Sequence, residues 1–590
     1  MSHPPDPLRA AIAVVCVACG ALSRSARCLL SACCVLLSSS ACTAMLDGRA
    51  EQCRSHADCQ RLDPAYVCAS DGVCVALSAE TRQLQDIAPE HPCSTDNDCA
   101  SSVGLALCRN GDCVPIHNPA QGCFLSAGPG ATLGAGEERA LPIGILVPSQ
   151  AAGSQRKTGL STAVGLAITE INGAREQRGL LQLPPLVGIE CDEERPDAVE
   201  YLLKKLQVRL VLGPSNPEQL RDTLSQRREP VLYMPPFPAE PDLAPEGAAG
   251  AAVLSCQPLH ASVHPYLLEA ITVAQRLVEA SAAPTLGSVA PGLAVSEDVA
   301  TTRFASGFND AELAAVGVRR VPYAMELGGR GLVSALAAAE PPIQLVVAAS
   351  AVDTWDINLG AVDGATFART GSYPYYLLAE KQPRVLEAAL RDDRTAPGFP
   401  RQYSRVLGLD AARDNQTKAL QLEFESAYAA STQSAPEPGL EYAYDCVYVS
   451  LYAMVAAALR LQQGASSLTS SALLQGPDAV LLGLRALQGG GPVQPVGALH
   501  IPEVLATLAA GQGRDHSLEL VGASSSLDFR FEPTAVASAR YVGLAPSDGE
   551  LYCIDAREQQ YCDTGIIFPA DGSEVRRPTG NVCACLGALP

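Results

Sequence analysis

The chain has 590 residues, 47% hydrophobic and 18% charged, and this composition excludes wholesale disorder, a collagen and a coiled coil. Lys and Arg number 42 against 63 Asp and Glu, and the resulting net charge of −21 disfavours binding to nucleic acid or to anionic lipid. Fourteen of the 22 cysteines lie at or before Cys113, so the N-terminal fifth differs in kind from the remainder.

Residues 1–42 are predicted to be a secretory leader. Arg24 and Arg27 precede the apolar run 28–37, and small residues follow as far as Cys42. This order of positive, apolar and small residues is that of a signal peptide. The chain is therefore expected to be exported to the periplasm or cell envelope.

The leader also resembles that of a bacterial lipoprotein, in which a small residue precedes the acylated cysteine that becomes the mature N-terminus. Two cysteines fit this pattern, Cys33 and Cys42, but only five residues separate Arg27 from Cys33. We therefore favour Cys42 as the lipidated residue. The alternative is a membrane-spanning helix, but the charge-free stretch 28–46 is just short of the roughly 20 apolar residues that a span needs. No later segment is predicted to span.

Two cysteine-rich modules, at 50–76 and 90–115, form an internal repeat. Neither has the Cys-x2-Cys knuckle of a zinc site, and an exported chain meets an oxidising compartment, so we predict disulfides within each repeat. The spacing leaves three connectivities open in each module. The modules are interpreted as a stiff stalk between the lipid anchor and the main domain, and the alternative is a protein- or glycan-binding module. The cysteines are Cys53, Cys59, Cys68 and Cys74, then Cys93, Cys99, Cys108 and Cys113.

A Gly-, Ala- and Pro-rich stretch at 117–139 is predicted to be a linker, and alternating strands and helices follow it. Strands that alternate with helices indicate a parallel sheet covered by helices on both faces. Ligands bind such sheets at the carboxyl ends of the strands. The expected strands are 141–147, 186–190 and 208–213, and the expected helices are 160–173 and 198–206.

Motifs spread over 140–550 resemble, in their order, the type 1 periplasmic binding proteins, and most closely the leucine/isoleucine/valine-binding branch. The resemblance implies an α/β fold of two lobes, each a parallel sheet flanked by helices, with three chain crossings and a ligand cleft that closes like a hinge. Residues 551–590 are expected to be a cysteine-containing extension. The motifs are 143–148, 163–172, 211–215, 230–235, 441–448 and 518–522 with 526–529.

The resemblance also implies ligand-binding positions, each with a plainer alternative. Ser215 and Asn216 match the family's hydroxyl pair, although helix N-capping explains them equally well. Glu380 matches an acid that pairs with a ligand ammonium, although it also suits an exposed surface. Ala239 lies near a threonine position of the family, and its substitution puts an α-amino acid ligand in doubt. Trp355 follows a predicted second-lobe strand and is a candidate aromatic wall, or else core packing.

Disulfides in the main domain are likewise implied by the resemblance. A first-lobe bridge common in this branch suggests that Cys191 pairs with Cys256, and Cys553 is expected to pair with Cys562. Cys446, which lies among apolar residues of a predicted helix, is then the candidate buried free thiol.

Catalytic motifs find no support in the sequence. Ser154-x-x-Lys157 and Lys157-Thr-Gly159 share a lysine, whereas in β-lactamases the two motifs lie on distant elements. His260 and His264 are spaced for one helix face, but no third metal ligand accompanies them. We therefore expect no enzyme activity, no cofactor and no metal.

The function indicated by the resemblance is that of an extracytoplasmic solute-binding lipoprotein. It would capture a small ligand, such as an amino acid, an amide or a peptide-like molecule, and deliver it to an ABC-type permease and ATPase complex. The alternative is a sensing or adhesion ectodomain of the same fold that acts without a transporter.

Overall fold

The structure is a computed structural model, and its chain falls into two compact units, 1–89 with 130–132 and 90–129 with 133–590. In the first unit the described part is a hairpin of β1 (Tyr66–Cys68) and β2 (Cys74–Ala76). The second unit is described over 93–96, 98–99, 105–128, 140–148, 155–180, 183–215, 217–226, 229–236, 250–258, 264–281, 289–296, 308–324, 329–348, 359–378, 405–437, 439–461, 477–531, 541–544, 548–555, 560–570 and 573–577.

The first lobe is built on an eight-stranded sheet whose inner strands are parallel. β5 and β18 are antiparallel at the two edges, and the strands between them run in parallel. In spatial order the strands are β18 (Phe529–Phe531), β19 (Tyr541–Leu544), β10 (Ala252–Pro258), β9 (Leu232–Met234), β8 (Leu210–Leu212), β6 (Leu141–Val147), β7 (Leu186–Asp192) and β5 (Cys123–Ala127).

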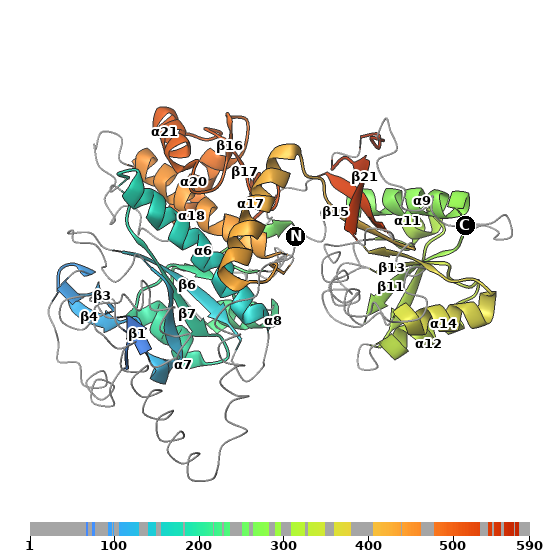
Figure 1. The fold of residues 1–590 in the computed structure, drawn as a ribbon, viewed down its shortest axis with the longest axis horizontal. Helices are drawn as coiled ribbons and strands as arrows, with labels where there is room; N and C mark the ends of the chain where they lie inside the picture. The colour runs from blue at the N-terminus through green and yellow to red at the C-terminus, as the bar shows by residue number, and fades with distance from the viewer. Residues whose placement is uncertain are drawn as a thin grey trace, which may run out of the picture. The chain divides into compact units, whose positions relative to one another are not determined.

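Helices cover both faces of this sheet, because its central strands are apolar on both sides (Figure 1). Ile143 and Ile145 of β6 point into the layer of α6 and α18, whereas Leu146 points into the layer of α7 and α8. The first layer comprises α6 (Gln155–Gln177), α17 (Asn415–Thr432), α18 (Leu440–Leu461), α20 (Pro477–Leu484) and α21 (Ile501–Gly511), with η8 (Arg485–Leu487) and the pair β16 (Val493–Pro495) and β17 (Glu519–Val521). The second comprises α7 (Pro196–Glu200), the π-helical turn η4 (Tyr201–Lys205) and α8 (Pro217–Gln226).

Helix α18 differs from the expectation that no segment after the leader could span a membrane. It is long and apolar enough to do so by length and composition, but 94% of its most apolar stretch is buried inside the protein. Its side chains pack against β6, β9 and β10 in the core of the first lobe. Its apolar character is thus accounted for by core packing.

The second lobe is built on a seven-stranded sheet. Its first five strands are parallel, and two antiparallel strands complete it. Helices α9 (His264–Ser281) and α11 (Asp310–Ala315) cover one face, and α12 (Gly329–Ala338) and α14 (Leu359–Thr370) cover the other. The strand order is β12 (Arg319–Tyr323), β11 (Pro291–Ser296), β13 (Leu345–Ala348), β14 (Tyr375–Leu378), β15 (Val406–Ala411), β20 (Gly549–Asp555) and β21 (Gln560–Phe568).

Both lobes repeat one topology. Counted from β6 in the first lobe and from β11 in the second, the second strand in sequence lies at one side of the first, and the third, fourth and fifth follow on the other side. The chain passes between the lobes three times, after β10, after β15 and after β19. These features confirm the predicted two-lobed α/β fold.

Two predicted domain boundaries were wrong. The stretch interpreted as a linker contains η2 (Pro119–Gln121) and β5, which extends the first-lobe sheet by pairing with β7. The stretch interpreted as a C-terminal extension contains β20 and β21, which pair with β15 and with each other. β5 and β21 lie at sheet edges and are largely half-buried, so they lack the continuous apolar run of the central parallel strands.

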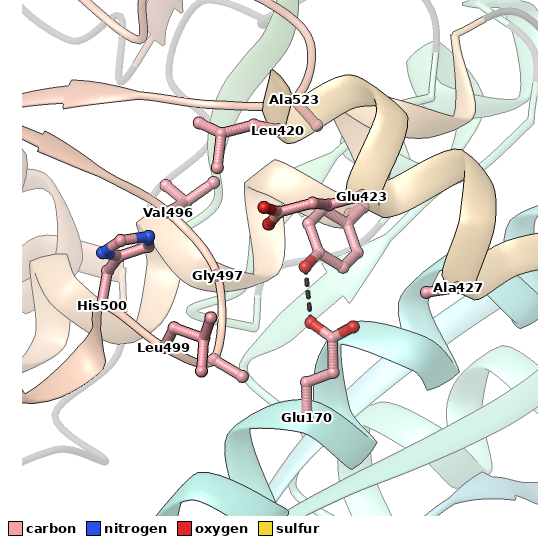
Figure 2. A pocket seen from close by; sticks show the side chains of 11 residues that line it. Glu170, Leu420, Glu423, Ala427, Val496, Gly497, Leu499, His500 and Ala523 are labelled. Atoms are coloured by element: carbon pink, nitrogen blue, oxygen red, sulfur yellow. Dashed lines mark hydrogen bonds between the residues drawn. The ribbon is translucent and has the colours of Figure 1, made fainter. Parts of the chain in front are cut away.

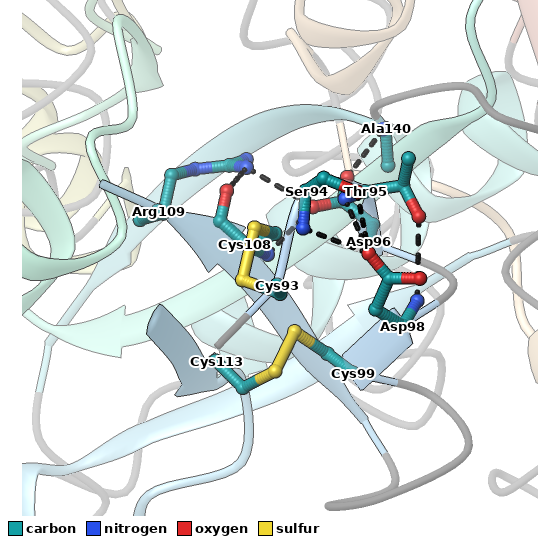
Figure 3. Close-up of a disulfide and its surroundings, with 10 residues drawn as sticks. All are labelled: Cys93, Ser94, Thr95, Asp96, Asp98, Cys99, Cys108, Arg109, Cys113 and Ala140. Atoms are coloured by element: carbon teal, nitrogen blue, oxygen red, sulfur yellow. Dashed lines mark hydrogen bonds and ion pairs between the residues drawn. A yellow bond between two sulfur atoms is a disulfide. The ribbon is translucent and has the colours of Figure 1, made fainter. Parts of the chain in front are cut away.

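The second cysteine module packs on the first lobe (Figure 3). Its hairpin, β3 (Ala106–Arg109) and β4 (Asp112–Pro115), is closed by Cys93–Cys108 and Cys99–Cys113, both within the repeat as predicted. The buried Asp96 carboxylate accepts the Ala140 N–H at 2.5 Å, and Arg109 donates to the Leu206 carbonyl at 2.9 Å. These buried contacts make this module a part of the first lobe and not a freely standing stalk.

The predicted bridge between Cys191 and Cys256 was wrong, and Cys446 is not a free thiol. Cys191 pairs with Cys123, which lies directly opposite it on β5, and Cys256 pairs with Cys446 of α18. Cys191 and Cys256 lie on strands four positions apart, about 19 Å at the usual strand spacing, and contribute to the cores on opposite faces of the sheet. Cys553 is disulfide-bonded, and Cys562 lies opposite it in the β20–β21 register.

Candidate functional site

Ser215 is the one predicted ligand-binding residue that lies within the described residues. Asn216, Ala239, Trp355 and Glu380 lie outside them, as do the leader and Cys42. Their proposed roles stay predictions. The site is therefore built from Ser215 outward.

The turn after β8 places Ser215 at the carboxyl edge of the first-lobe sheet. Gly213 adopts a positive φ of 110°, and a Cβ there would lie 2.8 Å from the Leu146 carbonyl oxygen, so this close approach requires glycine. The Gly213 N–H donates to the Met234 carbonyl of β9 at 2.9 Å. Ser215 is thus held beside the ends of β6 and β9.

Glu193, the residue after β7, is the partner of Ser215. Its carboxylate accepts the Ser215 N–H at 2.7 Å and also accepts the Ser215 hydroxyl. Its own N–H donates to the Val147 carbonyl at the end of β6 at 2.9 Å, and its carbonyl accepts from Gln219 of α8 at 2.7 Å. One residue therefore links the ends of three neighbouring strands and the helix that follows them.

Burial raises the pKa of Glu193 above its usual value, while the two donors of Ser215 act in the opposite direction. Glu193 is 6% exposed, and the adjacent Glu194 and Asp192 carboxylates raise its pKa further. Among the described residues, no lysine or arginine forms an ion pair with it. Glu193 is thus a buried acid whose carboxylate is stabilised by hydrogen bonds and, among the described residues, by no ion pair.

The contact between Glu193 and Ser215 favours a ligand that donates hydrogen bonds over one that presents a carboxylate. A ligand carboxylate that sought the donors of Ser215 would have to displace Glu193, and two carboxylates in one buried site repel each other. A ligand that donates, through an ammonium or an amide N–H, could instead bond to the Glu193 oxygens. The Ser215 hydroxyl donates to Glu193, and the N-capping alternative, in which the same oxygen would accept a backbone N–H, stays a prediction.

Comparison with solved structures finds several proteins to which this chain is similar. An ABC transporter substrate-binding protein from Desulfitobacterium hafniense, in complex with Leu, is 14% identical, with 72% of this chain and 100% of that chain covered and a TM-score of 0.43. A solute-binding protein from R. palustris, in complex with benzoate, is 12% identical over 75% of this chain and 99% of that chain, also with a TM-score of 0.43. A branched-chain amino acid ABC transporter protein from Rhodospirillum rubrum is 15% identical over 72% and 99%, with the same TM-score. No protein-family model and no curated protein matches the sequence.

The chain has the type 1 periplasmic-binding-protein fold. The strand order of the first-lobe sheet reverses beside β6, the first of its parallel strands, and ligands of open α/β sheets gather outside the carboxyl ends at that point. Glu193 and Ser215 follow the strands that flank β6 on either side. Their contact therefore lies across the end of β6.

Metal binding has no support in the described part of the chain. The one group of metal-ligating side chains found there is Cys93, Cys99 and Cys108, whose sulfur atoms lie within 4.8 Å of one another. All three are in disulfides, so none is available as a thiolate ligand.

Glu193 was missed by reasoning from the sequence. The signal available was an acidic residue directly after a buried strand, at 192–194, which the resemblance did not single out. Strand-end acids are common on surfaces, and only the burial of Glu193 and its contact with Ser215 distinguish it from its neighbours.

Proposed function

We propose that this protein is a non-catalytic extracytoplasmic solute-binding protein that captures a small ligand between its two lobes. The observation that carries the proposal is the buried hydrogen-bonded pair of Glu193 and Ser215 at the carboxyl edge of the first-lobe sheet. A polar group buried at a strand end, at the point of strand-order reversal, is where such folds bind ligands.

We further propose that the ligand presents a hydrogen-bond donor to the first lobe. Glu193 occupies the donors of Ser215, so an amide, a peptide-like molecule or an ammonium group matches this edge better than a free carboxylate does. Amides and short peptides are therefore expected to bind more tightly than simple carboxylic acids. An amino acid would bind through its ammonium group.

A thermal-shift screen of the full chain against amino acids, their amides and short peptides tests the proposal. A true ligand raises the melting temperature in a concentration-dependent way. Ser215→Ala is expected to weaken binding of that ligand roughly tenfold, because the hydrogen bond from the Ser215 hydroxyl to the Glu193 carboxylate is lost.

The matched control is Ser225→Ala, which removes an exposed hydroxyl at the end of α8 and is expected to leave affinity unchanged. The proposal fails if no compound in the screen shifts the melting temperature. It also fails if the affinity of a confirmed ligand is the same in both variants.

We propose that the protein is exported and anchored to the membrane by acyl chains on Cys42, and that it hands its ligand to a permease and ATPase complex. Disulfides among the described residues support export, because such bonds persist in oxidising compartments. A Cys42→Ser protein should leave the detergent phase in a partition assay. Ligand-dependent co-purification with permease and ATPase subunits would support transport, and ligand binding without such partners would favour the sensing alternative.

A further inference from the structure

The first lobe contains a second candidate binding site, separate from Glu193 and Ser215. A pocket of about 260 Å³ opens among α6, α17, α18 and the turn 496–500 (Figure 2). This volume lies just below the range of about 300–1,000 Å³ typical of small-molecule sites, so the pocket suits a small ligand.

One side of the pocket is acidic. Glu170 of α6 is half-buried, and its Oε2 accepts the hydroxyl of Tyr444 at 2.5 Å and that of Tyr448 at 2.8 Å. Its Oε1 accepts no hydrogen bond from the described residues. Glu423 of α17 lines the same pocket, and its charge adds to burial in raising the pKa of Glu170.

Positive charge is scarce around these two carboxylates. No lysine or arginine is among the lining residues, and His500 is the one titratable base there, 3.8 Å from Glu503. Arg178 lies nearby but does not line the pocket, and it donates to the Leu499 carbonyl at 2.9 Å. The acidic side therefore has no fixed counter-charge within the pocket.

The other side of the pocket is apolar. Leu420, Val496 and Leu499 form it, and the Leu499 side chain is 62% exposed although it is large and hydrophobic. The ring of Tyr444 adds an aromatic surface beside Glu170, which suits contact with a cation. A hard metal ion such as Ca²⁺ needs six to eight oxygen ligands, roughly, and these apolar walls do not supply them.

We propose that this pocket is a second ligand site, which binds a small organic cation with its ammonium group at Glu170 and Glu423 and its hydrocarbon or aromatic part against Leu420, Val496 and Leu499. The site does not depend on the proposed solute-binding function, because it shares no residue with the strand-edge pair. Its occupant is an amine with a short apolar tail.

Calorimetric titration of the full chain with 2-phenylethylamine tests this site, and 2-phenylethanol serves as an uncharged analogue of the same shape. The amine is expected to bind, and the alcohol to bind at least roughly tenfold more weakly, because it lacks the charge that the carboxylates complement. Glu170→Gln is expected to weaken amine binding roughly tenfold, and the more exposed Glu423→Gln roughly threefold.

The matched control is Glu176→Gln, which removes an exposed carboxylate from the same helix as Glu170 but outside the pocket, and which should leave amine binding unchanged. Glu423→Gln lies on an exposed position and leaves the buried tyrosine contacts intact, so the test remains decisive if Glu170→Gln fails to fold. Equal affinity for the amine and the alcohol would overturn the proposal. So would a lack of amine binding at about 1 mM, indifference to both pocket substitutions, or saturation by Ca²⁺ in place of the amine.

Discussion

Ser215 gives both of its donors, the backbone N–H and the hydroxyl, to a single buried carboxylate, that of Glu193. The Glu193 carboxylate thereby occupies two donors that would otherwise suit the anionic group of a ligand. Any ligand that binds at this edge must either displace Glu193 or bond to it, and the charge state of Glu193 decides which is easier.

The Ser215→Ala variant tests this relationship directly. Hydrogen bonds to a carboxylate favour its charged form, so loss of the hydroxyl should raise the pKa of Glu193 further above its usual value. Carboxyl-carbon NMR titration of Glu193 measures the shift, with Ser225→Ala as the control. An unchanged midpoint would mean that the hydroxyl does not stabilise the charge.

The raised pKa of Asp445 predicts how the free energy of unfolding depends on pH. It is buried in α18 and accepts hydrogen bonds from the N–H groups of Ala523 and Ser524, at 3.0 and 2.8 Å, and from the Ser524 hydroxyl. Burial nevertheless raises its pKa to about 7. In the unfolded chain the pKa is about 3.9, so between about pH 4 and 7 the folded state holds the extra proton and the free energy of unfolding falls as pH rises.

The Asp445→Asn variant should show a smaller slope of unfolding free energy against pH over that window. Glu170 and Glu193 also have raised pKa values and keep part of the slope in the same direction. Chemical denaturation at several pH values measures it, with the exposed Asp222→Asn as the control. A slope as steep as that of the parent protein would rule out this role for Asp445.

Gly522 and Gly173 should respond in opposite ways to alanine. A Cβ on Gly522 would lie 2.1 Å from Asp445 Oδ2, and three hydrogen bonds hold that carboxylate in place. Gly522→Ala is therefore expected to destabilise the protein by about 1–3 kcal/mol. Gly173 lies within α6, and a Cβ added there would meet nothing within 4 Å, so Gly173→Ala should stabilise by about 0.5–1 kcal/mol. Melting temperatures that shift in the same direction for both would contradict this.

Much of the fold could be predicted from hydrophobic patterning, because buried parallel strands are apolar along their whole length. The expected strand 141–147 coincides with β6, and the expected strand 186–190 begins where β7 begins. The edge strands β5 and β21 could not be predicted in this way, since pairing and not burial defines them.

The disulfide partners and the site acid needed the structure. Cys123 was assigned to a linker, so its position opposite Cys191 could not enter the prediction. Ser215 was predicted from its match to the hydroxyl pair of the family that the chain resembles, but its partner Glu193 comes from a different strand end 22 residues away in sequence, a contact that no local pattern reports.

The disulfides carry a prediction for the first cysteine module. In the second module Cys108 lies opposite Cys113 in the hairpin, and in the first Cys68 lies opposite Cys74 in the same antiparallel register. The first module should therefore pair Cys53 with Cys68 and Cys59 with Cys74, as the second pairs Cys93 with Cys108 and Cys99 with Cys113. Peptide mapping under non-reducing conditions checks this, and a Cys53–Cys59 or Cys53–Cys74 peptide would refute it.

Removal of the Cys123–Cys191 bridge should cost more stability than removal of Cys99–Cys113. The first closes a sequence separation of 68 residues and the second one of 14. In the chain-entropy description these loops correspond to about 4 and about 3 kcal/mol. Denaturation of the two double-serine variants compares them, and the reverse order would show that local packing outweighs loop length.

The second lobe contains a buried ion pair whose loss should be among the most damaging single changes there. Arg405 and Asp363 are each buried, with Arg405 Nη2 2.6 Å from Asp363 Oδ2 and Nη1 2.9 Å from Oδ1. The Tyr376 hydroxyl donates to the same carboxylate at 2.8 Å, and Arg405 donates to the Pro374 carbonyl at 2.6 Å.

Asp363→Ala leaves the Arg405 guanidinium buried without its counter-charge, so we expect a loss of about 3–5 kcal/mol of unfolding free energy. Glu340→Ala is the matched control, because it removes the exposed partner of Arg369, at 3.6 Å, where an ion pair is worth about 0–1 kcal/mol. The two variants separate burial from charge pairing as such, since both remove one carboxylate from an arginine. If denaturation shows equal losses for the two, the network around Asp363 contributes no more than a surface pair.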